Sequence, residues 1–254
     1  MAEIDRLRRE VIVASAIAGE GHIPSALSIL DILWIEYSVV MANQRRHHEE
    51  VDRFVLSKGH GSLALYVVLS EIGVIDKFEL GSFGQFDSRL GGHPDRQKIP
   101  GVEASTGSLG HGMPIAVGIA LAKQIQGSAG RVVTLIGDGE ANEGTIWETA
   151  LLAAHRHLKN LVCIVDYNHS TDRALALGSI AGKFAAFGWD VVEIDGHNPN
   201  EIEESLSHGK TTKPLAIIAN TIKGKGVKAM ENNPAWHHAA PKMNELENLL
   251  GEIS

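Results

Sequence analysis

The chain has little of the features that mark several common classes of protein. Only one of its 254 residues is a cysteine, Cys163, which excludes an internal disulfide. No run of about 20 uncharged apolar residues occurs, and the charged start MAEIDRLRRE has no apolar signal core. These absences predict a cytoplasmic protein without a membrane span. Cys163 lies within a predicted strand, so a buried and unreactive thiol is expected.

Basic charge and the common nucleotide motifs are also missing. The 23 lysines and arginines against 31 aspartates and glutamates give a net charge of -8, which offers no basic surface for nucleic acid. After Gly137 and Gly139, the third glycine of a dinucleotide fingerprint is replaced by Asn142. The run Gly209-Lys210-Thr211 lacks the first glycine of a P-loop, because Glu204 stands there. The sequence therefore disfavours dinucleotide and P-loop binding.

Strand and helix patterns alternate along most of the chain. Glycines crowd residues 81–112, which predicts long loops, and Pro24 suits the first turn of a helix. The pattern predicts an α/β fold in one domain, residues 1–254, with a parallel sheet flanked by helices on both faces. The predicted strands are 53–57, 131–136, 161–165, 189–194 and 214–222, and the clearest helices are 4–18, 63–72, 143–158 and 199–207.

Polar residues follow two neighbouring strands of the predicted sheet. Asp138 comes directly after the strand 131–136, in the run GDG, and Asn168 follows the strand 161–165. The carboxyl ends of parallel strands meet at one edge of a sheet, where ligands of such folds bind. A carboxylate and an amide oxygen suit Mg²⁺, while small glycines let backbone N–H groups approach a diphosphate. The alternative is a tight turn with an aspartate N-cap and an asparagine in a polar loop.

The chain contains 13 histidines, and several lie in loop-like segments. His22 occurs in GEGH, His60 in SKGHGS, His93 in GGHPD and His237 in WHHAAP. Zinc is an obvious alternative, but no HExxH motif occurs and the close histidine pairs lack accompanying cysteines or well-spaced carboxylates. A structural zinc site is therefore disfavoured.

The order of these segments, with STGSLGHG before GDG, resembles the amino-terminal domain of transketolases over roughly residues 8–241. Asn168 lies 30 positions beyond Asp138, a separation typical of that family. The resemblance implies the thiamine diphosphate-binding fold, with thiamine diphosphate and Mg²⁺, or Ca²⁺ or Mn²⁺, as cofactors. It implies that Asp138, Asn168 and the main-chain carbonyl of Ser170 are the metal ligands.

Further roles carry over from the resemblance by position. Glu143 matches a carboxylate at a subunit contact, although it also suits the first turn of a helix. Ile23, His111 and His238 depart from the family pattern on the substrate side, which leaves the sugar open, for example a sulfonated or branched one. The resemblance implies that the cofactor contacts His60, Gly107, Leu109, Gly139, Asn168, Lys223 and His237, and that His22, His93 and His237 are catalytic.

Full-length transketolases continue with a pyrimidine-binding domain and a third domain. The resemblance implies that a separate partner subunit carries them, with the cofactor at the interface of a heterotetramer containing two copies of each chain. The small-residue run GHGMPIAVGIALA suits a helix packed in such a dimer core, or an ordinary buried helix.

We therefore expect the amino-terminal subunit of a split transketolase, which transfers a two-carbon ketol unit from a ketose to an aldose. The enzymatic alternatives are the thiamine-binding subunit of a 2-oxo acid dehydrogenase and a deoxyxylulose phosphate synthase-like enzyme. A noncatalytic scaffold subunit is the alternative from another class, although a scaffold has no need for both Asp138 and Asn168.

Overall fold

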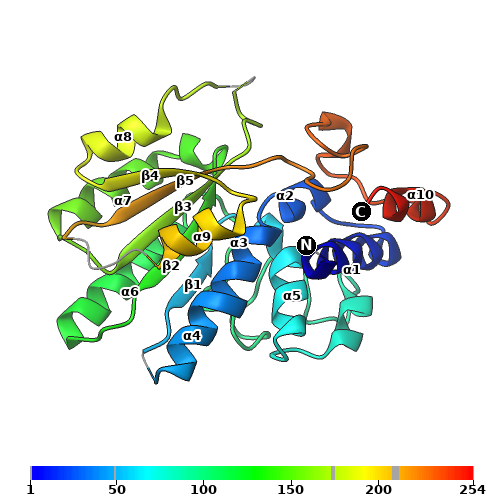
Figure 1. Ribbon diagram of the computed structural model, residues 1–254, viewed down its shortest axis with the longest axis horizontal. Coiled ribbons are helices and arrows are strands. Elements are labelled where there is room, and N and C mark those ends of the chain that lie inside the picture. Colours follow the sequence, from blue (N-terminus) through cyan, green and yellow to red (C-terminus); the bar gives the residue numbers. More distant parts are fainter. Residues whose placement is uncertain (1, 49, 173–174, 208–211, 254) are drawn as a thin grey trace.

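A computed structural model describes residues 2–48, 50–172, 175–207 and 212–253 (Figure 1). The run Gly209-Lys210-Thr211, which was compared with a P-loop above, lies outside these residues. Within them, a parallel sheet has the strand order β1-β2-β3-β5-β4. Its strands are β1 (Arg53–Leu56), β2 (Val132–Gly137), β3 (Leu161–Tyr167), β4 (Asp190–Asp195) and β5 (Leu215–Asn220).

The central strands are buried because their side chains are apolar on both faces of the sheet. All six residues of β2 are buried, and its alternate residues enter two separate apolar clusters. Val133 and Leu135 belong to one cluster, while Val132 and Ile136 belong to the other. The expected α/β fold with helices on both faces is therefore confirmed.

Figure 1 shows the two groups of helices on opposite sides of the sheet. One cluster is covered by α1 (Ala2–Ala18), α2 (Ile23–Leu27), α3 (Leu30–Ile35), α4 (Met41–Arg46), α5 (Ser62–Glu71), α9 (Pro199–Leu206) and α10 (Leu246–Gly251). The other is covered by α6 (Gly112–Gln126), α7 (Gly144–His155) and α8 (Ile180–Ala186). No helix among the described residues is both long enough and apolar enough to cross a bilayer.

The helical segment of residues 30–46 contains a turn that the sequence does not predict. A π-helical segment, η1 (Glu36–Val40), joins α3 to α4 and keeps the chain helical from residue 30 to residue 46. Its first residue, Glu36, is fully buried. The π turn therefore lies in the core rather than at the surface.

The chain ends also differ from the sequence pattern. The helix α10 was not predicted, and it packs against α1, where Arg9 Nη2 donates to the carbonyl of Ile253 at 2.5 Å. Figure 1 shows the two termini near each other. Short 3₁₀ helices complete the fold: η2 (Gly59–Gly61), η3 (Lys77–Ser82), η4 (Glu140–Asn142) and η5 (Pro234–Trp236).

Candidate functional site

The three residues predicted to hold a metal lie together at the carboxyl edge of the sheet. Gly137 of β2 pairs with Asp166 of β3, so Asp138 and Asn168 leave the sheet side by side. Ser170 connects them, because its Oγ donates to Asp138 Oδ1 at 3.1 Å and its N–H donates to Asn168 Oδ1 at 3.1 Å. The structure thus brings together all three residues that the sequence singled out.

Asp138 is a buried carboxylate, and no ion pair of the described residues involves it. Its side chain accepts the N–H of Gly139 at 2.7 Å and that of Thr171 at 3.4 Å, besides the Ser170 hydroxyl. Asp138 is only 2% exposed, and all three of these hydrogen bonds come from uncharged donors. A buried charge without a counterion is costly, so this site suits a bound cation.

A second polar network, centred on Asp166, contacts the side chain of Asn168. Asp166 is completely buried, and its Oδ2 accepts Asn168 Nδ2 at 2.9 Å and Lys58 Nζ at 2.5 Å. Burial opposes ionisation of Asp166, but the nearby Lys58 ammonium holds the pKa of that carboxyl below its usual value. The sequence pattern does not reveal this pair, because Lys58 and Asp166 are 108 positions apart in the chain.

Histidines from distant segments meet beside the metal residues. The ring centroid of His22 lies 5.2 Å from that of His60, 6.0 Å from that of His237 and 4.4 Å from that of His238. Lys223 Nζ lies 3.4 Å from His237 Nδ1. In the sequence His238 stands out only as a departure from the family pattern, yet its ring is the nearest of these to His22.

Burial and nearby positive charge favour the neutral form of His22, His60 and His237. Burial and the adjacent imidazoles, with Lys223, lower the pKa of His22 to about 4. Burial and Lys58 lower the pKa of His60 to about 2, while Lys223 and burial lower the pKa of His237. At neutral pH each of these rings therefore offers one N–H donor and one acceptor nitrogen.

The glycine loops are packed against one another around these residues. A Cβ on Gly107 would lie 3.1 Å from the His93 ring, and a Cβ on Gly59 would lie 2.8 Å from the backbone of Thr106. A side chain at position 59 would displace backbone, and one at position 107 would press against the His93 ring. The 3₁₀ turn that carries His60 is therefore fixed against the loop that carries Gly107.

Glu140 hydrogen-bonds to residues of three separate segments of the chain. The sequence does not predict it as a site residue. Its Oε1 accepts the Ser57 hydroxyl at 2.5 Å and the Gly110 N–H at 2.9 Å, and its Oε2 accepts the Gly137 N–H at 3.3 Å. Burial raises the pKa of the Glu140 carboxyl. This carboxyl thereby links the segments on either side of the GDG turn.

The remaining predicted residues, Gly139, Leu109 and Glu143, adjoin this region. The N–H of Gly139 donates to Asp138, and the carbonyl of the partly buried Leu109 lies 3.0 Å from His111 Nδ1. Glu143 is exposed and forms the N-cap of α7 without a side-chain capping bond. A Cβ on Gly110 would lie only 2.8 Å from the Cβ of Glu143, so Glu143 stands against the same loop.

The donor atoms fit a hard divalent cation and a diphosphate. No group of three or more histidine, cysteine, aspartate or glutamate side chains in the described part of the chain is arranged to hold a metal. The site instead offers oxygens of Asp138 and Asn168, the type of ligand that Mg²⁺ prefers, with phosphate oxygens and water completing its shell. Lys223 and the neutral imidazoles supply donors beside it.

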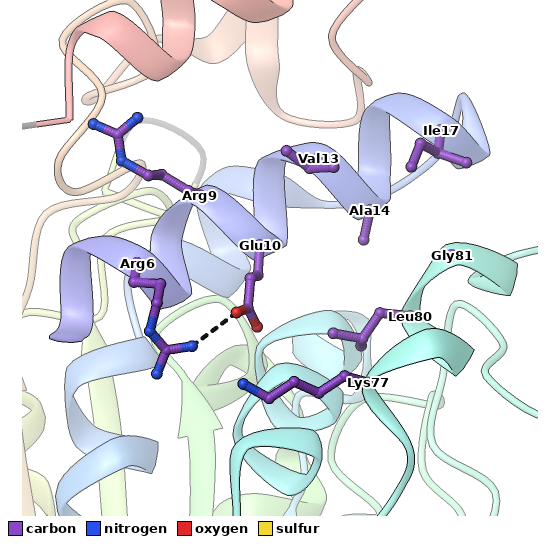
Figure 2. A pocket seen from close by; sticks show the side chains of 9 residues that line it. All are labelled: Arg6, Arg9, Glu10, Val13, Ala14, Ile17, Lys77, Leu80 and Gly81. Carbon is purple, nitrogen blue, oxygen red and sulfur yellow. Dashed lines mark hydrogen bonds and ion pairs between the residues drawn. The ribbon is translucent and has the colours of Figure 1, made fainter.

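A separate cavity of about 380 Å³ lies between α1 and η3 (Figure 2). Its lining includes Val13, Ile17 and Leu80, and the ion pair between Arg6 and Glu10 crosses one end at 2.8 Å. None of its lining residues belongs to the predicted site. The cavity is therefore distinct from the metal and histidine region.

The fold and the site define an open parallel α/β protein with a place for a metal-bound diphosphate at its carboxyl edge. A family model described as the transketolase thiamine diphosphate binding domain matches residues 2–252. The chain therefore belongs to the transketolase family, and it is a thiamine diphosphate-dependent transferase of the transketolase type.

Individual relatives agree with this assignment. The chain is 40% identical over 257 residues to one of the subunits of the apulose-4-phosphate transketolase of Actinobacillus succinogenes, covering 97% of this chain and 93% of that protein. It is 39% identical over 229 residues to the 6-deoxy-6-sulfo-D-fructose transketolase subunit SqwG of a Clostridium species, covering 87% and 83%.

The solved transketolases are similar to this chain over only part of their length. The transketolase of Leishmania mexicana has a TM-score of 0.84 and 28% identity, covering 100% of this chain and 41% of that one. The transketolase of Campylobacter jejuni has a TM-score of 0.83 and 29% identity, covering 99% and 43%. The fold described above is therefore that of one region of the full-length enzymes.

Proposed function

We propose that this chain, as a single domain of residues 1–254, is the diphosphate-binding subunit of a split transketolase. The observation that carries the proposal is the buried Asp138 carboxylate, which has no ion-pair partner among the described residues and is joined through Ser170 to the Asn168 amide oxygen. With the main-chain carbonyl of Ser170, these residues would hold Mg²⁺, or Ca²⁺ or Mn²⁺ in its place, bound to the diphosphate of the cofactor.

The histidine cluster would bind and orient the reactants. In this proposal His60, Lys223 and His237 would donate to phosphate oxygens, and the backbones of Gly107, Leu109 and Gly139 would border the cofactor. His22 and His93, with His237, would bind the hydroxyls of the sugar, because a neutral imidazole can donate or accept a proton at its ring nitrogens. Thiamine diphosphate, when bound, supplies the reactive carbon that carries the two-carbon unit.

The partner in this proposal is a separate chain that bears the pyrimidine-binding domain. Curated relatives that match most of this chain are themselves named as transketolase subunits, which supports a divided enzyme. We place Glu143, exposed at the start of α7, at the subunit interface of a heterotetramer with two copies of each chain. The proposed compartment is the cytoplasm, in keeping with a lone buried thiol.

The relatives' names support a proposal for the class of substrate. One relative is named for apulose 4-phosphate and another for 6-deoxy-6-sulfo-D-fructose, so a terminal anion is common to both sugars. We propose a ketose donor that carries a terminal phosphate or sulfonate. Ketol transfer from such a donor, without release of carbon dioxide from 2-oxo acids, would separate this function from the dehydrogenase alternative.

Calorimetric titration of thiamine diphosphate into the full chain tests the cofactor site. We expect binding with Mg²⁺, loss of binding after chelation with EDTA, and loss of binding in Asp138→Ala. Asp172→Ala is the matched control, because Asp172 is an exposed aspartate of the neighbouring loop that pairs with His169. Binding that is indifferent to both Mg²⁺ and Asp138 would refute the proposed site, and full ketol transfer by the lone chain would refute the proposed division of the enzyme.

A further inference from the structure

Asp166 collects hydrogen bonds from side chains of four different segments at the carboxyl edge of the sheet. Its Oδ2 accepts Lys58 Nζ at 2.5 Å, Ser28 Oγ at 2.8 Å and Asn168 Nδ2 at 2.9 Å. Its Oδ1 accepts the hydroxyl of Thr221. Asp166 itself is 0% exposed, so all of these bonds are formed away from water.

This arrangement allows the Asn168 amide only one orientation. An ionised carboxylate can accept hydrogen bonds but cannot donate them, so only the NH₂ end of the amide can face Asp166. The amide oxygen must then point the other way, where it accepts the N–H of Ser170 at 3.1 Å. If the amide were flipped, the Asn168 oxygen would lie against the Asp166 carboxylate oxygen, and the two would repel each other. The Asn168 NH₂ group would then face the N–H of Ser170, so two donors would oppose each other there.

Lys58 supplies the charge that lets Asp166 remain a carboxylate in this buried place. Lys58 is 1% exposed, and its ammonium also donates to the carbonyl of Ser25 at 3.2 Å. A buried carboxylate without such a partner is strongly disfavoured. The ion pair with Lys58 thus explains why the group that contacts the Asn168 amide is an ionised carboxylate, which can only accept hydrogen bonds.

We propose that the buried Lys58–Asp166 ion pair is a positioning device that turns the Asn168 amide oxygen toward the metal and so sets the metal affinity of the chain. Neither residue touches the metal in this scheme. The inference rests on the proposed function, because it assigns the Asn168 oxygen as a metal ligand. Removing a residue that hydrogen-bonds to a metal ligand typically weakens metal binding by about 10- to 100-fold.

The test uses the charge-neutral double substitution Lys58→Met with Asp166→Asn in the full chain. It leaves no buried charge without a partner, so the fold should be retained, but the amide at position 166 can present either its oxygen or its NH₂ to Asn168. We expect the Kd for Mg²⁺, titrated at saturating thiamine diphosphate, to rise about 10- to 100-fold. Lys123→Met is the matched control, since Lys123 is a buried lysine that pairs with Glu50 elsewhere.

A double-mutant cycle with Asn168→Ala separates positioning from a merely structural role. If the pair acts through the amide, the double substitution will not weaken Mg²⁺ binding further in the Asn168→Ala background. An additive loss there, or an equal loss in Lys123→Met, would overturn the inference.

Mg²⁺ binding by the wild-type chain and by Asp138→Ala distinguishes a failure of this inference from a failure of the proposed function. If the wild type binds and Asp138→Ala does not, but the double variant keeps the wild-type Kd, only the positioning inference fails. If the wild type shows no Mg²⁺-dependent binding, the proposed cofactor site fails and the positioning inference fails with it.

Discussion

Glu36 should make the chain less stable as the pH rises from about 4.5 to about 8. The side chain is 0% exposed, and neither of its carboxyl oxygens has a hydrogen-bond partner among the described residues. Burial, with a further contribution from Asp52, raises its pKa from 4.5 to about 8, although Arg131 opposes this. Glu36→Gln removes the ionisable group while nearly preserving its volume.

The sign follows from the two protonation equilibria. Below about pH 4.5 Glu36 is neutral in both states, so ionisation costs no stability. Between about 4.5 and 8 the unfolded chain loses this proton and the folded chain keeps it, so the free energy of unfolding falls as the pH rises. The difference amounts to roughly 3 kcal/mol at pH 7 and on the order of 5 kcal/mol above pH 8.

Urea denaturation of the wild type and Glu36→Gln from pH 5 to 8.5 measures this effect. Part of the gain is offset because a buried amide without partners is also unfavourable. We expect the variant to become progressively more stable than the wild type, by roughly 2–3 kcal/mol near pH 8, which corresponds to a Tm increase of about 4–12 °C. Glu148→Gln, at an exposed position of α7, is the control for net charge. Parallel stability curves for wild type and Glu36→Gln across this range would refute the reasoning.

Two further predictions concern the site. His238→Gly should raise the pKa of His22 from about 4 toward its ordinary value, because burial and then the electrostatic effect of His238 are the leading causes that lower it. An unchanged NMR titration of His22 would show that His238 does not lower this pKa. Gly59→Ala should destabilise the chain by about 1–3 kcal/mol in urea denaturation, because the new Cβ would lie 2.8 Å from the Thr106 backbone. Gly81→Ala is its control, since a Cβ there meets nothing within 4 Å, and equal stability of the two variants would show that the close approach carries no cost.

Much of the fold could be predicted because its signals are local. The apolar β-branched run of β2 and the helical spacing of α7 each lie within one short segment, and the structure differs from them only at the ends. The π segment η1 could not be predicted in this way. Nothing in the local pattern marks Glu36 as buried, because a glutamate in an amphipathic helix normally faces water.

The site residues also fall into those that local sequence patterns predict and those that they do not. Asp138 and Asn168 could be placed together from the sequence, because each follows a parallel strand and parallel neighbours end at one edge. His238 beside His22 could not, since the two rings come from opposite ends of the chain and no periodicity relates them. Their contact depends on how the segment after β5 folds back over the start of α2.

The sequence by itself determined the parallel α/β architecture and the pair of oxygen donors at its carboxyl edge, since both follow from residue order along single strands. Only the tertiary structure decided that Lys58 is buried against Asp166 and that this carboxylate orients the Asn168 amide. The physical reason is that burial and hydrogen-bond direction depend on groups brought together from several segments, which no single stretch of sequence specifies.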